Sequence, residues 1–176
     1  MYKSVLLACV FVLANTGVFS QNKSDNYSFF KLFVTDDKNR ILLVKWEGDW
    51  EIAGERYNQN LSISTFLDKM GTDMGIKLRD KKLRGLFTFH YPNRPNPTLM
   101  HYYQATCVSG MLKTPPDCAE IKWFSVKDAL QVIPYPAMKM IVEAMSGKPK
   151  AVFGGAFKPS GDQRQVEVLE KIYELD

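Results

Sequence analysis

The sequence predicts a single globular domain of the α/β (α+β) class. From residue 28 onwards, Ser28–Thr35 alternates with the period of a β-strand, and the apolar segment Ile41–Trp46 follows it as a second strand. Between residues 60 and 75 the apolar side chains recur every three or four positions, which is the period of an α-helix. A chain of 176 residues with 45% hydrophobic and 24% charged residues has the ordinary size and composition of one such domain.

The first two strands are expected to form a hairpin. Ser28–Thr35 carries aromatic side chains on both of its faces, and Ile41–Trp46 is the next apolar segment. Between them, Asp36–Asn39 favours a tight turn, because Asp and Asn side chains accept hydrogen bonds from the nearby backbone. After a further turn at Gly48–Asp49, Trp50–Ile52 predicts a short third strand.

The segment 60–75 predicts the first helix. Asn60 and Ser62 are both suitable N-caps, and Gly75 is a suitable C-terminal stop. The side chains of one helical stripe are Ile63, Phe66, Leu67, Met70 and Met74.

The second half of the chain returns to β-rich segments and ends in a tail of ambiguous period. Strands are expected at 83–91, 99–108 and 121–124, a proline-rich loop at 92–97, and helices from Ser125 and over 137–145. In the tail, 151–153 and 166–175 bracket a loop. From period alone, the second of these segments fits a helix at least as well as a strand.

The first twenty residues differ in character from the rest. A basic start at Lys3 is followed by the apolar run Val5–Ala14 and then by residues permissive for cleavage up to Ser20. The run is too short to cross a bilayer, which takes about 20 residues, but it suits a secretory signal. The alternative is a buried N-terminal strand or helix. We therefore expect a signal peptide at 1–20 and a domain at 28–176, secreted or periplasmic and free of the membrane after cleavage.

Two of the three cysteines, Cys107 and Cys118, lie outside the predicted signal peptide. An exported chain with two cysteines permits one disulfide, and two free, half-buried thiols are the other interpretation. Because no CxxC pair exists and the only histidines are His90 and His101, a structural zinc site is not expected. The formal charge of +4 is scattered along the chain, which does not favour a nucleic-acid partner.

Several stretches of the sequence resemble the Nudix hydrolase family, and the likeness covers residues 28–147. They are Trp50–Gly54 (WEIAG), Asp73–Ile76 (DMGI), Ile121–Leu130 (IKWFSVKDAL) and, as in the end of some Nudix proteins, Val152–Phe157 (VFGGAF). The resemblance implies a Nudix-type α/β/α sandwich with a mixed sheet. It also favours a strand extension, rather than a helix, for residues 150–176.

The resemblance further implies a Nudix box between Gly54 and Gly75, because these glycines have the family's spacing without a gap. Most of the chemical positions of the box depart from the family pattern. Asn60 stands in place of the first glutamate, Asp68 in place of the arginine, and Lys69, Thr72 and Asp73 in place of the three helical glutamates.

In the family, the helical glutamates present carboxylates to Mg²⁺. Here the same helix face offers a cation, a hydroxyl and one carboxylate, whereas Mg²⁺ requires oxygen ligands. An ammonium about 5 Å from a metal is repelled by about 3 kcal/mol per metal charge at an effective dielectric of about 20. No cofactor is therefore expected, and Mg²⁺ or Mn²⁺ only if the protein is catalytically active, with Asp73 as the metal ligand.

Two interpretations of the site remain open. If the acidic residues have moved, Glu55, Asp73 and Glu120 are the candidate catalytic residues of an atypical hydrolase for a nucleoside diphosphate-linked substrate. If they have not, the candidate ligand-binding residues are Trp50, Gly54 and Lys69, and the lysine could contact a phosphate directly.

We expect an exported Nudix-fold protein that lacks Mg-dependent diphosphate hydrolysis and binds an undetermined small molecule or protein partner. Export favours this function over the hydrolase, because free nucleoside diphosphates are scarce outside the cytoplasm. A mainly structural domain without a small-molecule pocket is the third hypothesis. The tail could also pair between subunits, which would give a homodimer.

Overall fold

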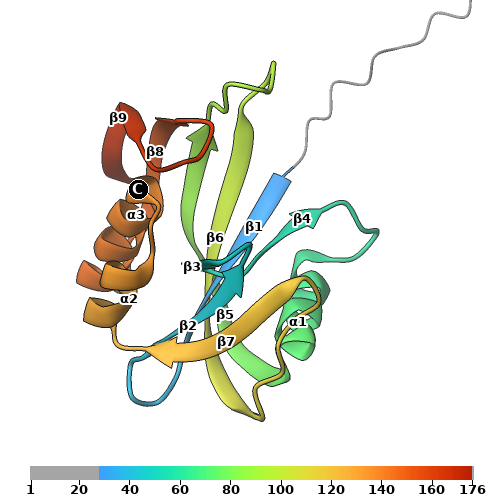
Figure 1. The fold of residues 1–176 in the computed structure, drawn as a ribbon. Coiled ribbons are helices and arrows are strands. Elements are labelled where there is room, and N and C mark those ends of the chain that lie inside the picture. Colours follow the sequence, from blue (N-terminus) through green and yellow to red (C-terminus); the bar gives the residue numbers. More distant parts are fainter. Residues whose placement is uncertain (1–27, 176) are drawn as a thin grey trace, which may run out of the picture.

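The computed structural model describes residues 28–175, which form nine strands and three α-helices (Figure 1). The predicted signal peptide at 1–20 lies outside these residues. In the described part of the chain, no helix is long and apolar enough to cross a membrane. The elements are β1 (Ser28–Thr35), β2 (Ile41–Trp46), β3 (Asp49–Glu51), β4 (Gly54–Tyr57), α1 (Ile63–Asp73), β5 (Ile76–Phe89), β6 (Thr98–Gly110), β7 (Cys118–Phe124), α2 (Val126–Val132), α3 (Pro136–Gly147), β8 (Val152–Pro159) and β9 (Val166–Leu175).

All nine described strands belong to one mixed sheet. Its main path runs β3-β2-β1-β6-β5-β8-β9, while β4 pairs with β1 and β7 pairs with β2. The contacts of β1 with β6 and of β5 with β8 are parallel, and the other pairs are antiparallel. The sheet therefore joins the first and last strands of the domain to the long central ribbon of β5 and β6.

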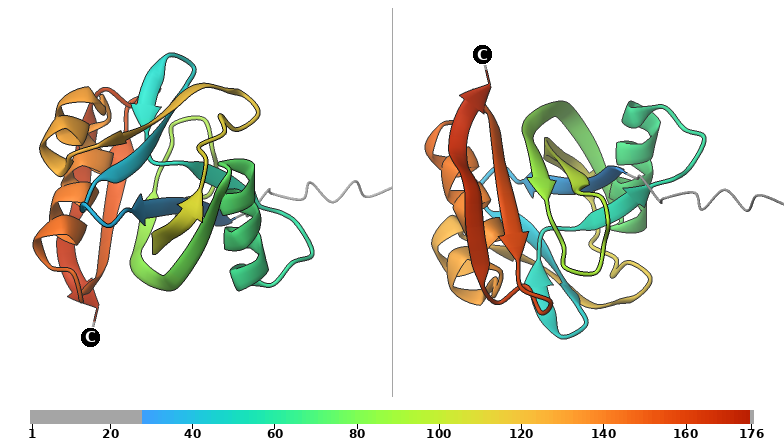
Figure 2. Two further views of the ribbon diagram at one scale, coloured as in Figure 1. Left: turned by 90° about the horizontal axis from the view of Figure 1, so that it is seen from below. Right: turned by 90° about the horizontal axis from the view of Figure 1, so that it is seen from above.

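The helices cover both faces of the sheet, with α1 on one side and α2 and α3 on the other (Figure 2). Side chains of β1 point to the two faces of the sheet and pack in both cores. Phe30 and Leu32 pack in the cluster that contains Phe66 of α1, whereas Phe33 packs in the cluster that contains Ile141 of α3. The α/β/α sandwich with a mixed sheet is confirmed.

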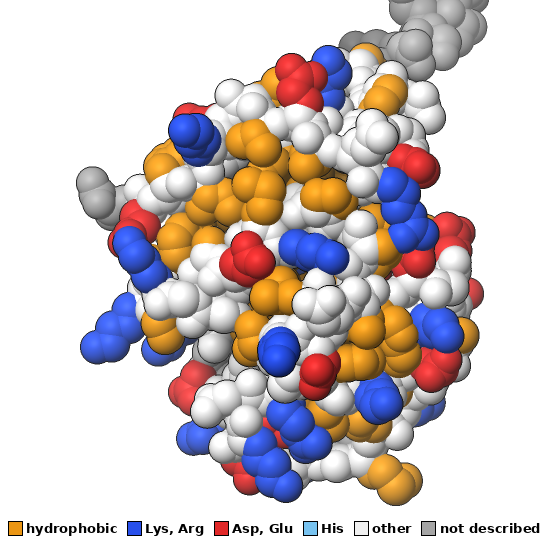
Figure 3. Space-filling view, turned by 60° about the vertical axis from the view of Figure 1, so that its left-hand side comes forward, with side chains coloured by type: hydrophobic (Ala, Val, Ile, Leu, Met, Phe, Trp, Pro, Cys, Tyr) orange, Lys and Arg blue, Asp and Glu red, His pale blue; other side chains and the backbone are white. Residues whose placement is uncertain are grey.

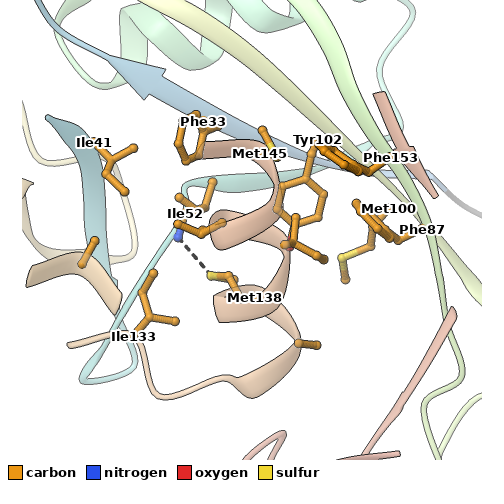
Figure 4. Packing of buried hydrophobic residues seen from close by; sticks show 14 of the residues in the cluster. Phe33, Ile41, Ile52, Phe87, Met100, Tyr102, Ile133, Met138, Met145 and Phe153 are labelled. Carbon is orange, nitrogen blue, oxygen red and sulfur yellow. Dashed lines mark hydrogen bonds between the residues drawn. The ribbon is translucent and has the colours of Figure 1, made fainter. Parts of the chain in front are cut away.

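The cluster under α3 shows how the third layer is attached (Figure 4). Met138 points from α3 towards the chain just after β3, and the backbone N–H of Ile52 donates to its sulfur at 3.4 Å. Ile52 and Tyr102 are almost fully buried in this cluster. Burial of a large apolar side chain contributes about 1.5–3 kcal/mol to the free energy of folding. The packing of these side chains therefore holds α3 against the sheet.

The helix termini agree with the predicted N-cap and stop of the first helix and with the predicted start of the second. Ser62 is the N-cap of α1, and its hydroxyl accepts the backbone N–H of Thr65 at 3.2 Å. Ser125 caps α2 through the N–H of Asp128 at 3.1 Å. Gly75 adopts φ +75° directly after α1, which is the left-handed conformation expected of a C-terminal glycine.

The predicted hairpin of the first two strands is present only at its turn. Asp36 Oδ1 accepts the backbone N–H groups of Lys38 at 3.0 Å and Arg40 at 2.8 Å, as the turn chemistry requires. The register between the strands is limited to Thr35 opposite Ile41. Beyond that pair the strands diverge, because β1 runs along β6 while β2 runs along β7 and β3.

The strands differ from the prediction at several ends. β4 was not predicted, because Gly54–Tyr57 has only four residues and no apolar alternation. β7 begins at Cys118 rather than at residue 121, and β8 ends at Pro159 rather than at residue 153. β5 begins at Ile76 rather than near residue 83, and its first half is rich in charge and partly exposed. Register shifts between Lys77 and Gly85 and a positive φ of 55° at Asp80 disturb this part of the strand, which hides its period in the sequence.

The tail forms two strands, as the resemblance implied. β8 adds parallel to β5, with Gly85 opposite Phe153, and β9 pairs antiparallel with β8 at the sheet edge. Phe153 and Phe157 are buried in the same cluster as α3.

The buried Arg84 holds the junction between α3 and β8 together. Its guanidinium donates to the carbonyls of Ala151 at 2.7 Å, Lys148 at 2.8 Å and Met145 at 3.0 Å, and also to the side chain of Gln104. Burial lowers the pKa of Arg84 from its usual value. Because these carbonyls end α3 and begin β8, this one side chain helps to place the tail beside β5.

Candidate functional site

A cleft of about 830 Å³ lies between α1 and the loop that joins β8 to β9. It has two distinct ends. The polar end consists of Glu55 of β4 with Lys69 and Asp73 of α1. The aromatic end consists of Phe29, Phe89, Tyr91, Tyr102 and Tyr135.

At the polar end, one ammonium joins two carboxylates. Lys69 Nζ lies 3.1 Å from both carboxylate oxygens of Glu55 and 2.8 Å from Oδ2 of Asp73. Lys69 and Asp73 share a helix face because they are four residues apart, and β4 brings Glu55 to the same point. Gln59 supports this arrangement by donating its side-chain amide to Glu55 at 2.9 Å.

These contacts raise the pKa of Lys69 above its usual value, first through the hydrogen bond to Asp73 and then through the hydrogen bond and charge of Glu55. Partial burial of the ammonium opposes the change. Lys69 is therefore fully protonated at neutral pH, and each of its three donors has an oxygen within hydrogen-bond distance.

The polar end does not fit the divalent metal that the resemblance implies. A metal would need the position between Glu55 and Asp73, and the ammonium of Lys69 takes that position. Within residues 28–175, no group of three or more His, Cys, Asp or Glu side chains could hold a metal ion. The expected ligand Asp73 is thus engaged with a cation of the chain itself.

Gly54 allows the cleft floor to form. It lies opposite Lys31 in the pairing of β1 with β4. A Cβ at this position would come within 2.5 Å of Cε1 of Phe29 and 2.7 Å of Cδ of Lys31. The sequence suggested Gly54 as a ligand-binding residue, and in the structure it lines the cleft where a side chain would collide with the floor.

The floor contains a buried ion pair that the sequence did not reveal. Lys31 Nζ lies 3.1 Å from Oε1 of Glu51 and donates to the carbonyl of Ile52 at 3.1 Å. The two side chains are only 6% and 15% exposed, so neither charge is freely solvated. Lys31 sits in a strand that is otherwise largely buried, and nothing in the local sequence marks it as a cleft residue.

The aromatic end gathers tyrosines from three separate segments around this pair. Burial raises the pKa values of Tyr91, Tyr102 and Tyr135, and the negative charge of Glu51 adds to the effect for all three. Their phenols therefore stay neutral at physiological pH and can act as hydrogen-bond donors and acceptors.

Two predicted site residues lie elsewhere. Glu120 of β7 is exposed and pairs with Lys45 Nζ at 2.7 Å, so the structure does not bring it to Glu55 and Asp73. Trp50 does not line the cleft, because its ring packs on Phe124 with centroids 4.9 Å apart. Its neighbour Trp46 contributes to the cleft instead.

The structure does not contain the disulfide between Cys107 and Cys118 that the sequence permitted. Cys107 and Cys118 are both free and partly buried. Burial raises the pKa of each thiol, which lowers its reactivity at neutral pH. The alternative of two half-buried thiols describes their state.

On the face in Figure 3, apolar side chains gather in the upper middle of the view, and Lys and Arg side chains lie around them with acidic side chains in between.

Comparison with solved structures finds MutT and NUDIX proteins whose fold is similar to that of this chain. The mutator MutT protein from Bacillus halodurans matches with a TM-score of 0.69 and 17% identity, over 84% of this chain and 97% of that one. The MutT protein from Methanosarcina mazei Go1 matches with a TM-score of 0.59 and 15% identity, over 73% and 98%. A NUDIX hydrolase from Nitrosomonas europaea matches with a TM-score of 0.58 and 15% identity, over 70% and 90%.

No protein-family model matches the sequence, and no curated protein matches it. Identities of 14–20% to the solved structures show the fold alone.

Proposed function

We propose that this chain, which has the fold of the Nudix hydrolases, binds a small molecule in its cleft without metal-dependent hydrolysis of a diphosphate. The observation that carries the proposal is the position of Lys69, whose ammonium lies between Glu55 and Asp73. A hydrolase of this fold would need that position for a divalent metal.

The arrangement opposes metal binding in two ways. A metal entering between the carboxylates would be repelled by the ammonium unless the lysine moved away. Moving it would separate Lys69 from both Glu55 and Asp73. Mg²⁺ requires several oxygen ligands in near-octahedral geometry, and two carboxylates already bound to a cation are a poor starting set.

The cleft itself favours ligand binding over a purely structural role. Its volume lies within the range of small-molecule sites, and its aromatic walls surround a small number of polar groups. Five of the charged residues that line it pair with one another, Lys31 with Glu51 and Lys69 with Glu55 and Asp73, and Arg56, Arg94 and Asp117 line it as well. A free phosphate at the polar end would meet the carboxylates of Glu55 and Asp73, so a ligand with a flat apolar part fits the aromatic walls better.

Export is part of the proposal and depends on the sequence of residues 1–20 alone. A secreted or periplasmic protein meets few free nucleoside diphosphates, so loss of their hydrolysis is consistent with that location.

The atypical hydrolase remains the second candidate, because Glu55 and Asp73, two of its three acids, do meet in the cleft. Its third acid, Glu120, pairs with Lys45 instead.

Calorimetric titration of Mg²⁺ and Mn²⁺ into the mature protein, with and without ADP-ribose, tests the proposal. We expect no metal binding up to millimolar concentrations and no phosphate-containing product. Metal binding accompanied by turnover would establish the hydrolase instead. A ligand found by thermal-shift screening should bind equally well with and without EDTA, and EDTA-sensitive binding would contradict the proposal.

A further inference from the structure

We propose that the loop between β8 and β9 is held over the aromatic end of the cleft by a latch, and that this latch controls which molecules enter. The latch consists of Asp49, Tyr135 and Arg164. The inference rests on the proposed function in treating the cleft as a ligand site, but the latch can be tested without a ligand.

Three segments that are far apart in the sequence meet at Asp49. Arg164 Nη2 lies 2.7 Å from Oδ2 of Asp49, and the hydroxyl of Tyr135 donates to the same oxygen at 3.1 Å. The guanidinium also stands 5.7 Å from the centroid of the Tyr135 ring. The contacts join the β8–β9 loop to the start of β3 and to the N-terminus of α3.

The loop is ordered by its own hydrogen bonds as well as by the latch. Ser160 Oγ donates to Oδ1 of Asp162 at 2.6 Å and accepts the backbone N–H of Gln165 at 3.0 Å. The N–H of Arg164 donates to Asp162 at 3.1 Å. The latch adds the contacts that tie this loop to β3 and α3, so its release lets the hydrogen bonds within the loop open more often.

Two of the three latch residues position the wall without being part of it, while Tyr135 also lines the cleft. Gln163 lies next to Arg164 and lines the cleft, as do Gly161 and Pro159 of the same hairpin. Tyr91 reaches towards this wall, with its hydroxyl 3.5 Å from the side-chain oxygen of Gln163. Asp49 and Arg164 do not line the cleft, so they act as positioning residues.

Charge reversal provides a direct test. Arg164→Glu would set a carboxylate against Asp49 and open the latch, while Lys158→Glu is the matched control. Lys158 lies on the same hairpin, pairs with Glu167 at 3.1 Å and does not line the cleft, and its reversal changes the net charge equally. The double variant Asp49→Lys/Arg164→Glu restores the attraction with the signs exchanged.

Hydrogen exchange measured by mass spectrometry gives the first readout. We expect Arg164→Glu to accelerate exchange of residues 160–165 by about three- to tenfold, and Lys158→Glu by less than about twofold, because the Lys158–Glu167 pair joins only β8 to β9 whereas the latch joins the loop to β3 and α3. The double variant should return exchange to within about twofold of the wild type. Equal acceleration by both single reversals, or no restoration in the double variant, would overturn the latch.

Entry into the cleft gives the second readout, with the fluorescent probe 1-anilinonaphthalene-8-sulfonate. Its association rate, followed by stopped-flow fluorescence, should rise in Arg164→Glu relative to Lys158→Glu, because both variants repel the anionic probe equally. Equal rates would show that the loop does not control entry. Neither readout uses a metal, so failure of the latch and failure of the proposed function are distinguishable.

Discussion

The two ends of the cleft are built differently. The polar end comes from one short stretch of chain, since Glu55, Lys69 and Asp73 lie on neighbouring elements and are all partly exposed. The aromatic end joins β1, β5, β6, the start of α3 and the tail, and Phe89 and Tyr102 are buried there. The polar end can therefore change its chemistry through single substitutions, whereas the aromatic end depends on the whole fold.

The largest loss of stability is expected for a substitution at Phe157, which is fully buried beside β5. Phe157→Ala is expected to lower the free energy of unfolding by about 3–5 kcal/mol, because it removes apolar burial and leaves a cavity. Val168 lies opposite Phe157 on β9 and is 38% exposed, so Val168→Ala should cost less than about 1 kcal/mol. Urea denaturation measures both, and equal losses would contradict the assigned role of the tail.

An intermediate effect is expected at Gly54, where the two ends meet. Gly54→Ala should destabilise the protein by about 1–3 kcal/mol, because the new Cβ would press on Phe29 and Lys31. Gly147 at the end of α3 has no atom within 4 Å of a new Cβ, so Gly147→Ala is the matched control. Thermal unfolding should show a loss only for Gly54→Ala. A neutral result there would mean that the floor can shift.

The smallest effect on stability is expected at Lys69. Lys69→Met should change the free energy of unfolding by less than about 1 kcal/mol at neutral pH, because the ion pairs are partly exposed. The folded protein raises the pKa of Lys69, so its contribution is present below pH 10.5 and is lost as the pH rises through the raised pKa. Denaturation curves of wild type and variant should converge at strongly alkaline pH. A gap that widens with pH would contradict this sign.

The two ends of the cleft also differ in how much of them could be predicted from the sequence. The stripe of α1, its N-cap Ser62 and the positions of Lys69 and Asp73 depend on local period and spacing. The structure confirms these positions, except that Ile63 at the start of the stripe is exposed. Glu55 and Lys69 are only fourteen residues apart, on β4 and on the helix that follows it, so their contact needs no long-range pairing.

The aromatic end could not be predicted, because it depends on long-range pairing. The parallel addition of β8 to β5 brings Gln163 to Tyr91 across more than seventy positions, and no local pattern encodes that contact. Glu120 was misplaced for a related reason. It was expected just before the predicted strand 121–124, but it lies within β7, and the pairing of β7 with β2 places it opposite Lys45.

The most direct test of the central claim is Mn²⁺ binding, measured by electron paramagnetic resonance, in the wild type, Lys69→Glu and Lys81→Glu. Lys81 is the matched control, because it pairs with Asp68 on another side of α1 at 2.5 Å. If the ammonium of Lys69 takes the place of a metal, only Lys69→Glu should bind Mn²⁺ at submillimolar concentrations. Binding of equal strength by the wild type, or no binding by Lys69→Glu, would contradict the account.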